Sequence, residues 1–275
     1  MSYYSIIVIF AKKARGAVVH RFMRNSDTSD HMGRGGRWGG AILAVGLPRR
    51  DEPELIDAPG LADAELLENL LDLSMVNRLG GGVWLSTWAV RRFVQSAQLT
   101  GAVPAAAFVQ PAAWDVLDVG CGIGDMPRAF AGRVLAVDIS PQIVRMAAMR
   151  GGGVAYAAAD ALRLPLADAS VGVAHCSFTL HHFAPPQAVA LLRELRRVAR
   201  HGVVLNDLLR SWPGLAGAWL LGHLISANRL TRHDGLASAR RAYTLAELLA
   251  IAHQAGLRPL AVRAIPGYRA ALALA

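Results

Sequence analysis

The sequence predicts an α/β protein built on a doubly wound sheet of seven strands, with a helical lid ahead of the sheet. Two observations predict this fold. From residue 114 onward, short apolar runs alternate with helix-compatible segments, which is the pattern of a parallel sheet covered by helices. The chain then closes with two apolar runs, residues 257–265 and 268–274, which indicate an antiparallel hairpin at the end of the sheet.

Length and composition set the broad class. The chain has 275 residues, 53% of them hydrophobic, which suffices for one α/β domain with an accessory segment. Its net charge is +9, but residues 1–40 hold seven basic residues and two aspartates, so they account for +5 of it. The remaining +4 is an ordinary surface balance, which argues against a nucleic-acid partner. Only two cysteines occur, Cys121 and Cys176, which favours a reducing cytoplasm over a disulfide scaffold.

The first 40 residues differ from the rest of the chain. They contain both lysines and end in a glycine-rich stretch, so we expect a poorly ordered leader. One hypothesis for this leader is that translation starts at Met23 or Met32, so that the residues upstream are not part of the native protein. The other hypothesis is a basic targeting arm. The apolar run 6–10 is too short for an export signal, and 212–225 falls below the roughly 20 apolar residues of a membrane span. We therefore expect a soluble, cytoplasmic protein.

Residues 41–110 are assigned to the helical lid. A helix is predicted to begin at Asp63, which can cap it, to present a face of leucines and to stop at the glycines 80–82. A second helix over 83–98 carries Trp84 and Trp88 four residues apart. For these two aromatics we expect packing into the core rather than contact with a cofactor. Both helices precede the glycine-rich turn, where many small α/β enzymes carry a lid.

The central stretch of the chain is Val-Leu-Asp-Val-Gly-Cys-Gly-Ile-Gly-Asp, residues 116–125. It predicts a buried strand over 116–119, a tight turn and a helix that opens over 126–131. Alternate glycines let the backbone approach a ligand closely, so the turn is expected to hold a nucleoside-bearing cofactor. Asp125 places a negative charge at the predicted helix N-terminus, which a pyrophosphate needs positive. The turn therefore favours a ligand without phosphate.

Polar residues follow the other predicted strands, which cover 134–137, 154–157, 171–176 and 203–205, with helices over 141–150 and 186–200. In open α/β sheets, ligands bind outside the carboxyl ends of the strands. The side chains at or just beyond those ends are Asp118, Asp138, Asp160, Asp207 and the segment from His175 to His182. We expect them to converge on one crevice.

Four motifs, in this order and at these spacings, carry a specific resemblance: residues 118–124, 138–140, 159–161 and 180–183. With them the chain resembles a class I S-adenosylmethionine-dependent methyltransferase of the small-molecule type, similar to quinone and phenolic methyltransferases (methyltransferase type 11-like). The resemblance covers residues 111–275 at the level of fold, a Rossmann-like methyltransferase domain. Residues 205–210 and 228–235 further resemble bacterial methyltransferases found with polyketide or phenolic-lipid synthesis.

The resemblance implies a cofactor site for S-adenosylmethionine, in which Asp118 lies near the methionine ammonium group. Asp138, 20 residues further on, stands at the offset at which an acid accepts both ribose hydroxyls. Asp160 would accept from the adenine amino group, between apolar contacts of the ring with Ile139 and Leu162. A helix cap or a surface turn is the alternative role for each aspartate. The predicted cofactor-binding residues are Asp118, Gly120, Gly122, Gly124, Asp138, Ile139, Asp160, Ala161, Leu162 and His175.

Methyl transfer requires alignment of the reactants and, for an oxygen nucleophile, a base. The candidates are His181, His182, Asp207 and His233. Similarity to small-molecule O-methyltransferases implies His182 or His181 as the base with Asp207 orienting it, whereas carbon methyltransferases of the family keep a similar pair without that demand. A structural role for either histidine stays open. No metal site is expected from residues 175–182, because ligand-spacing signatures are missing.

Residues 208–242 are predicted to form the binding side for the methyl acceptor. They are an insertion before a helix that Thr244 and Glu247 cap with a capping box. Its apolar run 212–225 and polar run 229–241 would wall a pocket for an aromatic or lipid-like acceptor, or pack against the lid. The predicted activity is methylation of a small, phenolic or polyketide-derived acceptor, with O-methylation favoured over C-methylation. A nucleic-acid or protein methyltransferase is one alternative. The absence of an Asn/Asp-Pro-Pro-aromatic motif after the fourth strand argues against it. The second alternative is an inactive regulatory subunit that binds the cofactor.

Overall fold

The computed structural model of the protein describes residues 46–99 and 114–275; the predicted leader, residues 1–40, lies outside these ranges. The strands are β1 (Trp114–Val119), β2 (Val134–Asp138), β3 (Val154–Ala158), β4 (Val171–Ser177), β5 (Ala199–Leu208), β6 (Pro259–Ile265) and β7 (Arg269–Leu274). The α-helices are α2 (Asp63–Leu79), α3 (Gly82–Leu99), α4 (Pro141–Met149), α5 (Pro185–Val198), α6 (Trp212–Ile225), α7 (Arg229–Arg241) and α8 (Leu245–Gln254). Short 3₁₀ helices are η1 (Leu55–Asp57), η3 (Pro127–Ala129) and η4 (Leu180–His182).

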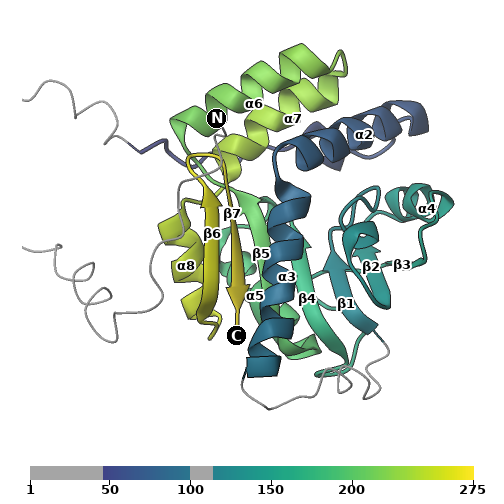
Figure 1. Ribbon diagram of the computed structural model, residues 1–275. Helices are drawn as coiled ribbons and strands as arrows, with labels where there is room; N and C mark the ends of the chain where they lie inside the picture. Colours follow the sequence, from purple (N-terminus) through teal and green to yellow (C-terminus); the bar gives the residue numbers. More distant parts are fainter. Residues whose placement is uncertain (1–45, 100–113) are drawn as a thin grey trace, which may run out of the picture. The chain divides into compact units, whose positions relative to one another are not determined.

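The seven strands form one sheet in the order β3-β2-β1-β4-β5-β7-β6 (Figure 1). The first five are parallel, and β7 runs antiparallel to both β5 and β6. This confirms the predicted α/β fold with its final hairpin. The strand order reverses between β1 and β4, the position at which such sheets open a crevice for ligands.

Helices cover the sheet on two faces (Figure 1). On one face α5 and α8 pack on the main core, to which β1, β4 and β5 contribute alternate residues such as Leu117 and Leu205. On the other face α3 buries Leu85, Ala89 and Phe93 against β4, β5 and β7. The predicted lid segment, residues 41–110, thus contains one helix, α3, that packs on the sheet. The parts of this segment that lie over the cavity described below are η1 and α2.

Trp84 and Trp88 lie on the outer side of α3, where the guanidinium of Arg263 stands 4.6 Å and 4.9 Å from their ring centroids. The side chain of Trp84 is about half exposed. Trp84 therefore contacts strand β6 at the surface, whereas Trp88 is partly buried and packs against the core between α3 and the sheet, as predicted for it.

The helix predicted over 126–131 is absent from the structure. Only the three-residue η3 follows the glycine turn, because the backbone becomes extended at Phe130, with a φ of −86° and a ψ of 146°. Asp125 is therefore not at the N-terminus of an α-helix; its Oδ2 accepts a hydrogen bond of 2.7 Å from Asn77 of α2. The argument against a pyrophosphate drawn from a helix dipole at this position does not apply.

The other capping predictions can be compared with the backbone directly. The capping box is confirmed: the Glu247 amide donates to Thr244 Oγ1 at 3.2 Å, and the Thr244 amide donates to the Glu247 carboxylate at 2.7 Å. Gly80 is the C-cap of α2, also as predicted. Asp63, in contrast, is the first residue of α2 rather than its cap, and it accepts a hydrogen bond from Gln142 of α4.

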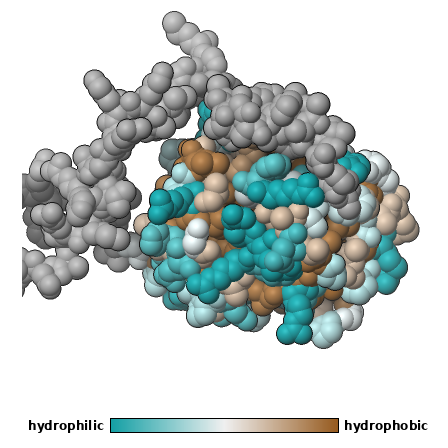
Figure 2. Space-filling model, turned by 90° about the horizontal axis from the view of Figure 1, so that it is seen from below, coloured by the Kyte–Doolittle hydropathy of each residue, from teal (hydrophilic) through white to brown (hydrophobic). Residues whose placement is uncertain are grey.

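The late insertion forms two helices, α6 and α7, which lie beside α2 over the carboxyl ends of the parallel strands (Figure 1). Figure 2 views the molecule from below, at the amino ends of those strands, where hydrophilic and hydrophobic residues are interspersed. Within residues 46–99 and 114–275, no helix has the length and apolar character needed to cross a membrane.

Candidate active site

A cavity of about 690 Å³ opens at the carboxyl ends of β1, β2 and β4. The glycine turn forms its floor, and η1 and α2 cover it together with Ala218, Leu221 and Gly222 of α6 and residues of α7. The apolar run predicted to wall a pocket does so through this inner side of α6, while Trp219 and Leu224 point outward and are exposed. The cavity has an acidic end at β1 to β3 and a histidine end at η4.

At the acidic end, Asp118 and His175 are direct partners in the register of β1 and β4. His175 Nδ1 lies 2.6 Å from Asp118 Oδ1, and its Nε2 lies 2.8 Å from Ser86 Oγ of α3. Burial raises the pKa of Asp118, against the opposing effect of His175. Asp118 Oδ2 is buried and has no hydrogen-bond partner in the described part of the chain, although Asp118 lines the cavity. His175, predicted as a cofactor-binding residue, does not line the cavity and contacts Asp118 instead.

The turn itself is held by Asp138 at the end of β2. Its Oδ2 accepts from the Gly122 amide and its Oδ1 from the Ser140 amide, each at 3.1 Å. Burial raises the pKa of Asp138 against these hydrogen bonds. Gly122 has a φ of +50°, and a Cβ there would meet no described atom closer than Leu70 Cδ2 at 3.8 Å. The space in front of Gly122 is therefore free for a ligand.

Gly120 and Gly124 are required for packing instead. A Cβ on Gly120, at a φ of +72°, would lie 2.1 Å from Thr179 Oγ1, and one on Gly124 would lie 2.3 Å from the Tyr156 hydroxyl. Gly120 lines the cavity and Gly124 does not. Of the three predicted glycines, Gly122 is the one at which the absence of a side chain leaves room for a ligand.

The remaining predicted cofactor residues follow β2 and β3. Ile139 lines the cavity and is 71% exposed, so its side chain is free to cover a bound ring. Asp160 and Ala161 also line the cavity, and Asp160 Oδ1 accepts from the Leu162 amide at 2.9 Å. Leu162 packs against the main core and is not part of the lining. The structure therefore brings Ile139, Asp160 and Ala161 together, with Leu162 set back from them.

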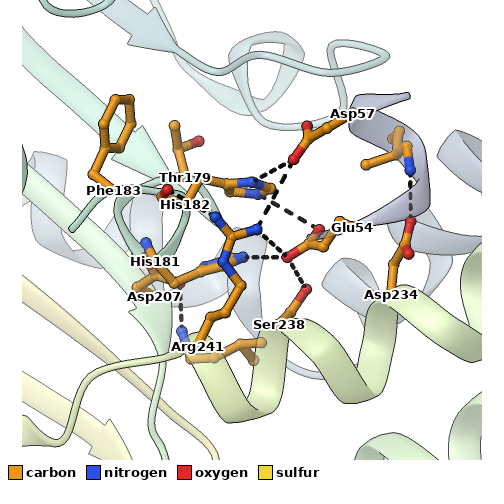
Figure 3. Close-up of polar contacts among 12 residues, drawn as sticks. Glu54, Asp57, Thr179, His181, His182, Phe183, Asp207, Asp234, Ser238 and Arg241 are labelled. Atoms are coloured by element: carbon orange, nitrogen blue, oxygen red, sulfur yellow. Dashed lines mark hydrogen bonds and ion pairs between the residues drawn. The ribbon is translucent and has the colours of Figure 1, made fainter. Parts of the chain in front are cut away.

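At the histidine end, His181 is held between two carboxylates (Figure 3). Its Nδ1 lies 2.7 Å from Asp207 Oδ1, and its amide donates to Asp207 Oδ2 at 3.1 Å. Its Nε2 lies 3.5 Å from Glu54 Oε1. Burial alone would lower the pKa of His181, but Asp207 and then Glu54 raise it to about 10. Asp207 thus orients His181, and it lies behind that residue rather than in the lining of the cavity.

His182 has different partners. Its Nε2 lies 3.6 Å from Glu54 Oε2 and its Nδ1 lies 3.4 Å from Asp57 Oδ2. Its side chain is 25% exposed and lines the cavity, so a ligand can reach it more readily than the buried His181. The prediction that Asp207 orients the base therefore applies to His181 and not to His182. His233, a further candidate, pairs with Asp234 at 2.8 Å and is not part of the cavity lining.

The backbone of the histidine pair is fixed from outside the sheet. Arg49 donates to the carbonyls of His181 and Phe183, and Arg241 donates to that of His182. Tyr243 adds a hydrogen bond of 2.6 Å from its hydroxyl to the Phe183 carbonyl. These donors hold both imidazoles in place, which a short 3₁₀ helix would not do alone.

Glu54 and Asp57 are site residues that the sequence did not reveal. Contacts with His181 and His182 outweigh the effect of burial on Glu54 and lower its pKa to about 2. Both acids lie ahead of α2, in a proline-containing segment whose sequence is typical of a linker. Their role depends on α7, where Ser238 donates to Glu54 at 2.8 Å and Asp234 accepts from the Leu55 and Ile56 amides. No local pattern in the sequence signals these contacts.

The acidic end fits the predicted cofactor. The unpartnered Asp118 Oδ2 offers an acceptor to an ammonium group, and the space before Gly122 admits a ligand next to the backbone. The acidic side chains at this end, Asp118, Asp138 and Asp160, are acceptors, which suits the amino and hydroxyl groups of a ligand.

Comparisons with known proteins agree with these features. A family profile described as a methyltransferase domain matches residues 116–202. A malonyl-acyl-carrier-protein O-methyltransferase of Pseudescherichia vulneris is 33% identical over 46% of this chain and 53% of its own length. The O-methyltransferase cnsE of Penicillium expansum is 30% identical over 51% of this chain and 56% of its own. The chain thus matches about half the length of these two relatives.

Among solved structures, a chain in the complex of a Haloferax volcanii methyltransferase activator with a methyltransferase has a TM-score of 0.50 at 19% identity. The match covers 78% of this chain and 81% of that one. At this identity the likeness concerns the fold alone.

Proposed function

We propose a function for this chain on the premise that residues 116–202 form a class I S-adenosylmethionine-dependent methyltransferase domain. The chain is an enzyme that methylates a small, aromatic or lipophilic acceptor, and oxygen is the favoured nucleophile. One observation carries this proposal: a single cavity joins the acids at the ends of β1 to β3 with the histidine pair at η4.

The cofactor end binds and orients. We assign Asp118 Oδ2 to the methionine ammonium group, with His175 and Ser86 holding the carboxylate in place. Asp138 accepts from the ribose hydroxyls while it keeps the Gly122 amide fixed. Asp160 and Ile139 meet the adenine. When bound, S-adenosylmethionine supplies an electrophilic methyl group on a good leaving group, so the protein mainly has to align the reactants and exclude water.

The acceptor end supports an oxygen nucleophile. Glu54, His181 and His182 line the cavity beside apolar residues of α2 and α6, so a lipophilic body and a polar group find matching surroundings. A hydroxyl next to His182 is in reach of a ring nitrogen that can take its proton, the role predicted for this histidine. The two relatives are named as O-methyltransferases, which supports the same preference. A phenolic or polyketide-derived acceptor of secondary metabolism is the class we propose.

The test uses the purified full chain in two steps. Calorimetry with S-adenosylhomocysteine measures cofactor binding, and we expect one site per chain. Incubation with S-adenosylmethionine carrying a labelled methyl group, with a panel of phenols, enols and carboxylic acids, then identifies the product by mass. Labelled O-methyl product supports the proposal. Binding without any transfer to the panel or to an extract of the source would favour the inactive regulatory subunit, and no binding at millimolar ligand would overturn the cofactor assignment.

We also place the protein in the cytoplasm. Cys121 and Cys176 are both buried and free, which agrees with a reducing compartment. Fractionation of source cells with an antibody to the chain checks this, and recovery from an exported fraction would contradict it.

A further inference from the structure

The histidine end of the cavity has a geometry that the proposed methyl transfer does not itself require. Both histidines have a carboxylate next to Nδ1: Asp207 is hydrogen-bonded to His181 at 2.7 Å, and Asp57 lies 3.4 Å from His182. Both direct Nε2 toward the carboxylate of Glu54 (Figure 3). One ring nitrogen held by a carboxylate while the other points to a shared centre is the arrangement of histidines that ligate a metal ion.

Distances support a shared centre over simple ion pairs. His181 Nδ1 meets Asp207 at 2.7 Å, the length of a charge-assisted hydrogen bond. The two Nε2 atoms stand 3.5 Å and 3.6 Å from the oxygens of Glu54, beyond hydrogen-bond range. Two ligand atoms that each lie ~2.05 Å from one tetrahedral ion are about 3.4 Å apart. One ligand atom from each of the three side chains lies within 4.8 Å of the others.

The charges of the cluster also match a divalent ion. Glu54, Asp57 and Asp207 bring three carboxylates to two imidazoles. Arg241 Nη1 lies 3.8 Å from Glu54 Oε1 and 3.9 Å from Asp57 Oδ2, and its Nε lies 3.3 Å from Asp51. Arg269 acts on Asp207. These two arginines offset two of the three carboxylate charges, and a ring proton or a bound cation would offset the third.

We propose that Glu54, His181 and His182 form a binding site for one divalent transition-metal ion of the zinc class. Two imidazoles and one carboxylate suit Zn²⁺ and similar ions better than Mg²⁺, which prefers oxygen ligands. Three protein ligands leave a fourth position toward the cavity, as in catalytic rather than structural zinc sites. Metal binding displaces ring protons and leaves Asp207 and Asp57 as the outer partners. This departs from the expectation of no metal site, which was drawn from residues 175–182 alone.

The site gives the proposed reaction a second route to an ionised acceptor, and this consequence rests on the proposed function. An acceptor hydroxyl that takes the fourth position loses its proton at lower pH, because the cation stabilises the oxyanion. His182 would then act as a ligand, and the proton would pass to water in the cavity.

Calorimetry with ZnCl₂ tests the site in the untagged, chelator-treated full chain. We expect one ion per chain, with Mg²⁺ binding at least 100-fold more weakly. Glu54→Gln and His182→Ala should each abolish binding, and Asp207→Asn should weaken it about 10–100-fold, the usual effect of removing an outer partner. His253→Ala, which removes an exposed histidine of α8, should leave it unchanged.

Two readouts keep the outcomes separate. Calorimetry with S-adenosylhomocysteine confirms that each variant is folded, and Co²⁺ spectroscopy of the wild-type chain reports nitrogen ligands without any variant. Absence of Zn²⁺ binding in the wild type, or binding unchanged in Glu54→Gln, would overturn the metal site. Methyl transfer that continues in excess chelator would overturn only the catalytic route, and Zn²⁺ binding without methyl transfer would leave the site intact while the proposed function fails.

Discussion

The two ends of the cavity are built in opposite ways. The cofactor end takes Asp118, Asp138 and Asp160 from three consecutive strand ends, and backbone amides of the glycine turn and of the residues that follow bind the last two of these acids. The histidine end joins His181 and Asp207 to Glu54, which lies far from both in the chain. The first arrangement follows from strand order, whereas the second depends on how η1, η4, β5 and α7 meet. Variants at the two ends should therefore affect different measurements.

The largest effect is expected at the histidine end. His182→Ala removes the imidazole that the acceptor reaches, whether it takes a proton or holds an ion, so turnover should fall by about 10²–10⁴-fold. Affinity for S-adenosylhomocysteine should change by no more than a few-fold, since the acids of the cofactor end stay in place. Turnover and calorimetry on the same preparation, with His253→Ala alongside, measure this. Unchanged turnover would show that the end near η4 takes no part in the reaction.

The converse effect is expected for Asp138→Ala. It removes the proposed acceptor of both ribose hydroxyls and frees the Gly122 amide, so the affinity for S-adenosylhomocysteine should fall by about 100-fold or more, given about 1.5–3 kcal/mol for each hydrogen bond to a charged group. Asp168→Ala is the matched control, because that aspartate is exposed and pairs with Arg197 at the surface. Equal affinities of the two variants would remove Asp138 from the cofactor site.

A third pair of variants separates ligand space from packing within the glycine turn. Gly122→Ala should keep the fold at a cost of about 1–2 kcal/mol for its positive φ, and should weaken cofactor binding about tenfold because its Cβ enters the cavity. Gly120→Ala should lose more stability, since its Cβ would collide with Thr179. Thermal unfolding and calorimetry distinguish the two. A Gly122→Ala protein with full affinity would mean that the ligand does not approach this backbone.

The smallest effect is expected for Asp160→Ala, which removes one hydrogen bond to the adenine amino group. Because Asp160 is exposed, its hydrogen bond should contribute less than that of the buried Asp138, about 1 kcal/mol or about fivefold in affinity. Calorimetry with S-adenosylhomocysteine and with its inosine analogue checks it: the wild-type chain should prefer the adenine form, and the variant should not. A preference that survives in the variant would place the amino group elsewhere.

The sequence predicted more of the cofactor end than of the histidine end, because the cofactor end follows from the order of the strands. Strand ends in a parallel sheet meet along one edge, so Asp118, Asp138 and Asp160, which lie at or just beyond three strand ends, can be expected to converge without any tertiary information. The helix expected after the glycine turn was wrong because the backbone becomes extended at Phe130, after a single 3₁₀ turn. The sequence pattern of 126–131 does not show where the backbone leaves helical geometry.

By itself, the sequence determined the seven-stranded sheet, the capping box at Thr244 and the acidic character of the cofactor end. These follow from local rules of backbone geometry and from the shared edge of parallel strands. Only the tertiary structure decided that Asp207 holds His181 and not His182, and that Glu54 closes the histidine end. The contact between Glu54 and His181 joins residues more than 100 positions apart, so it depends on the packing of helices over the sheet, and no spacing along the chain encodes it.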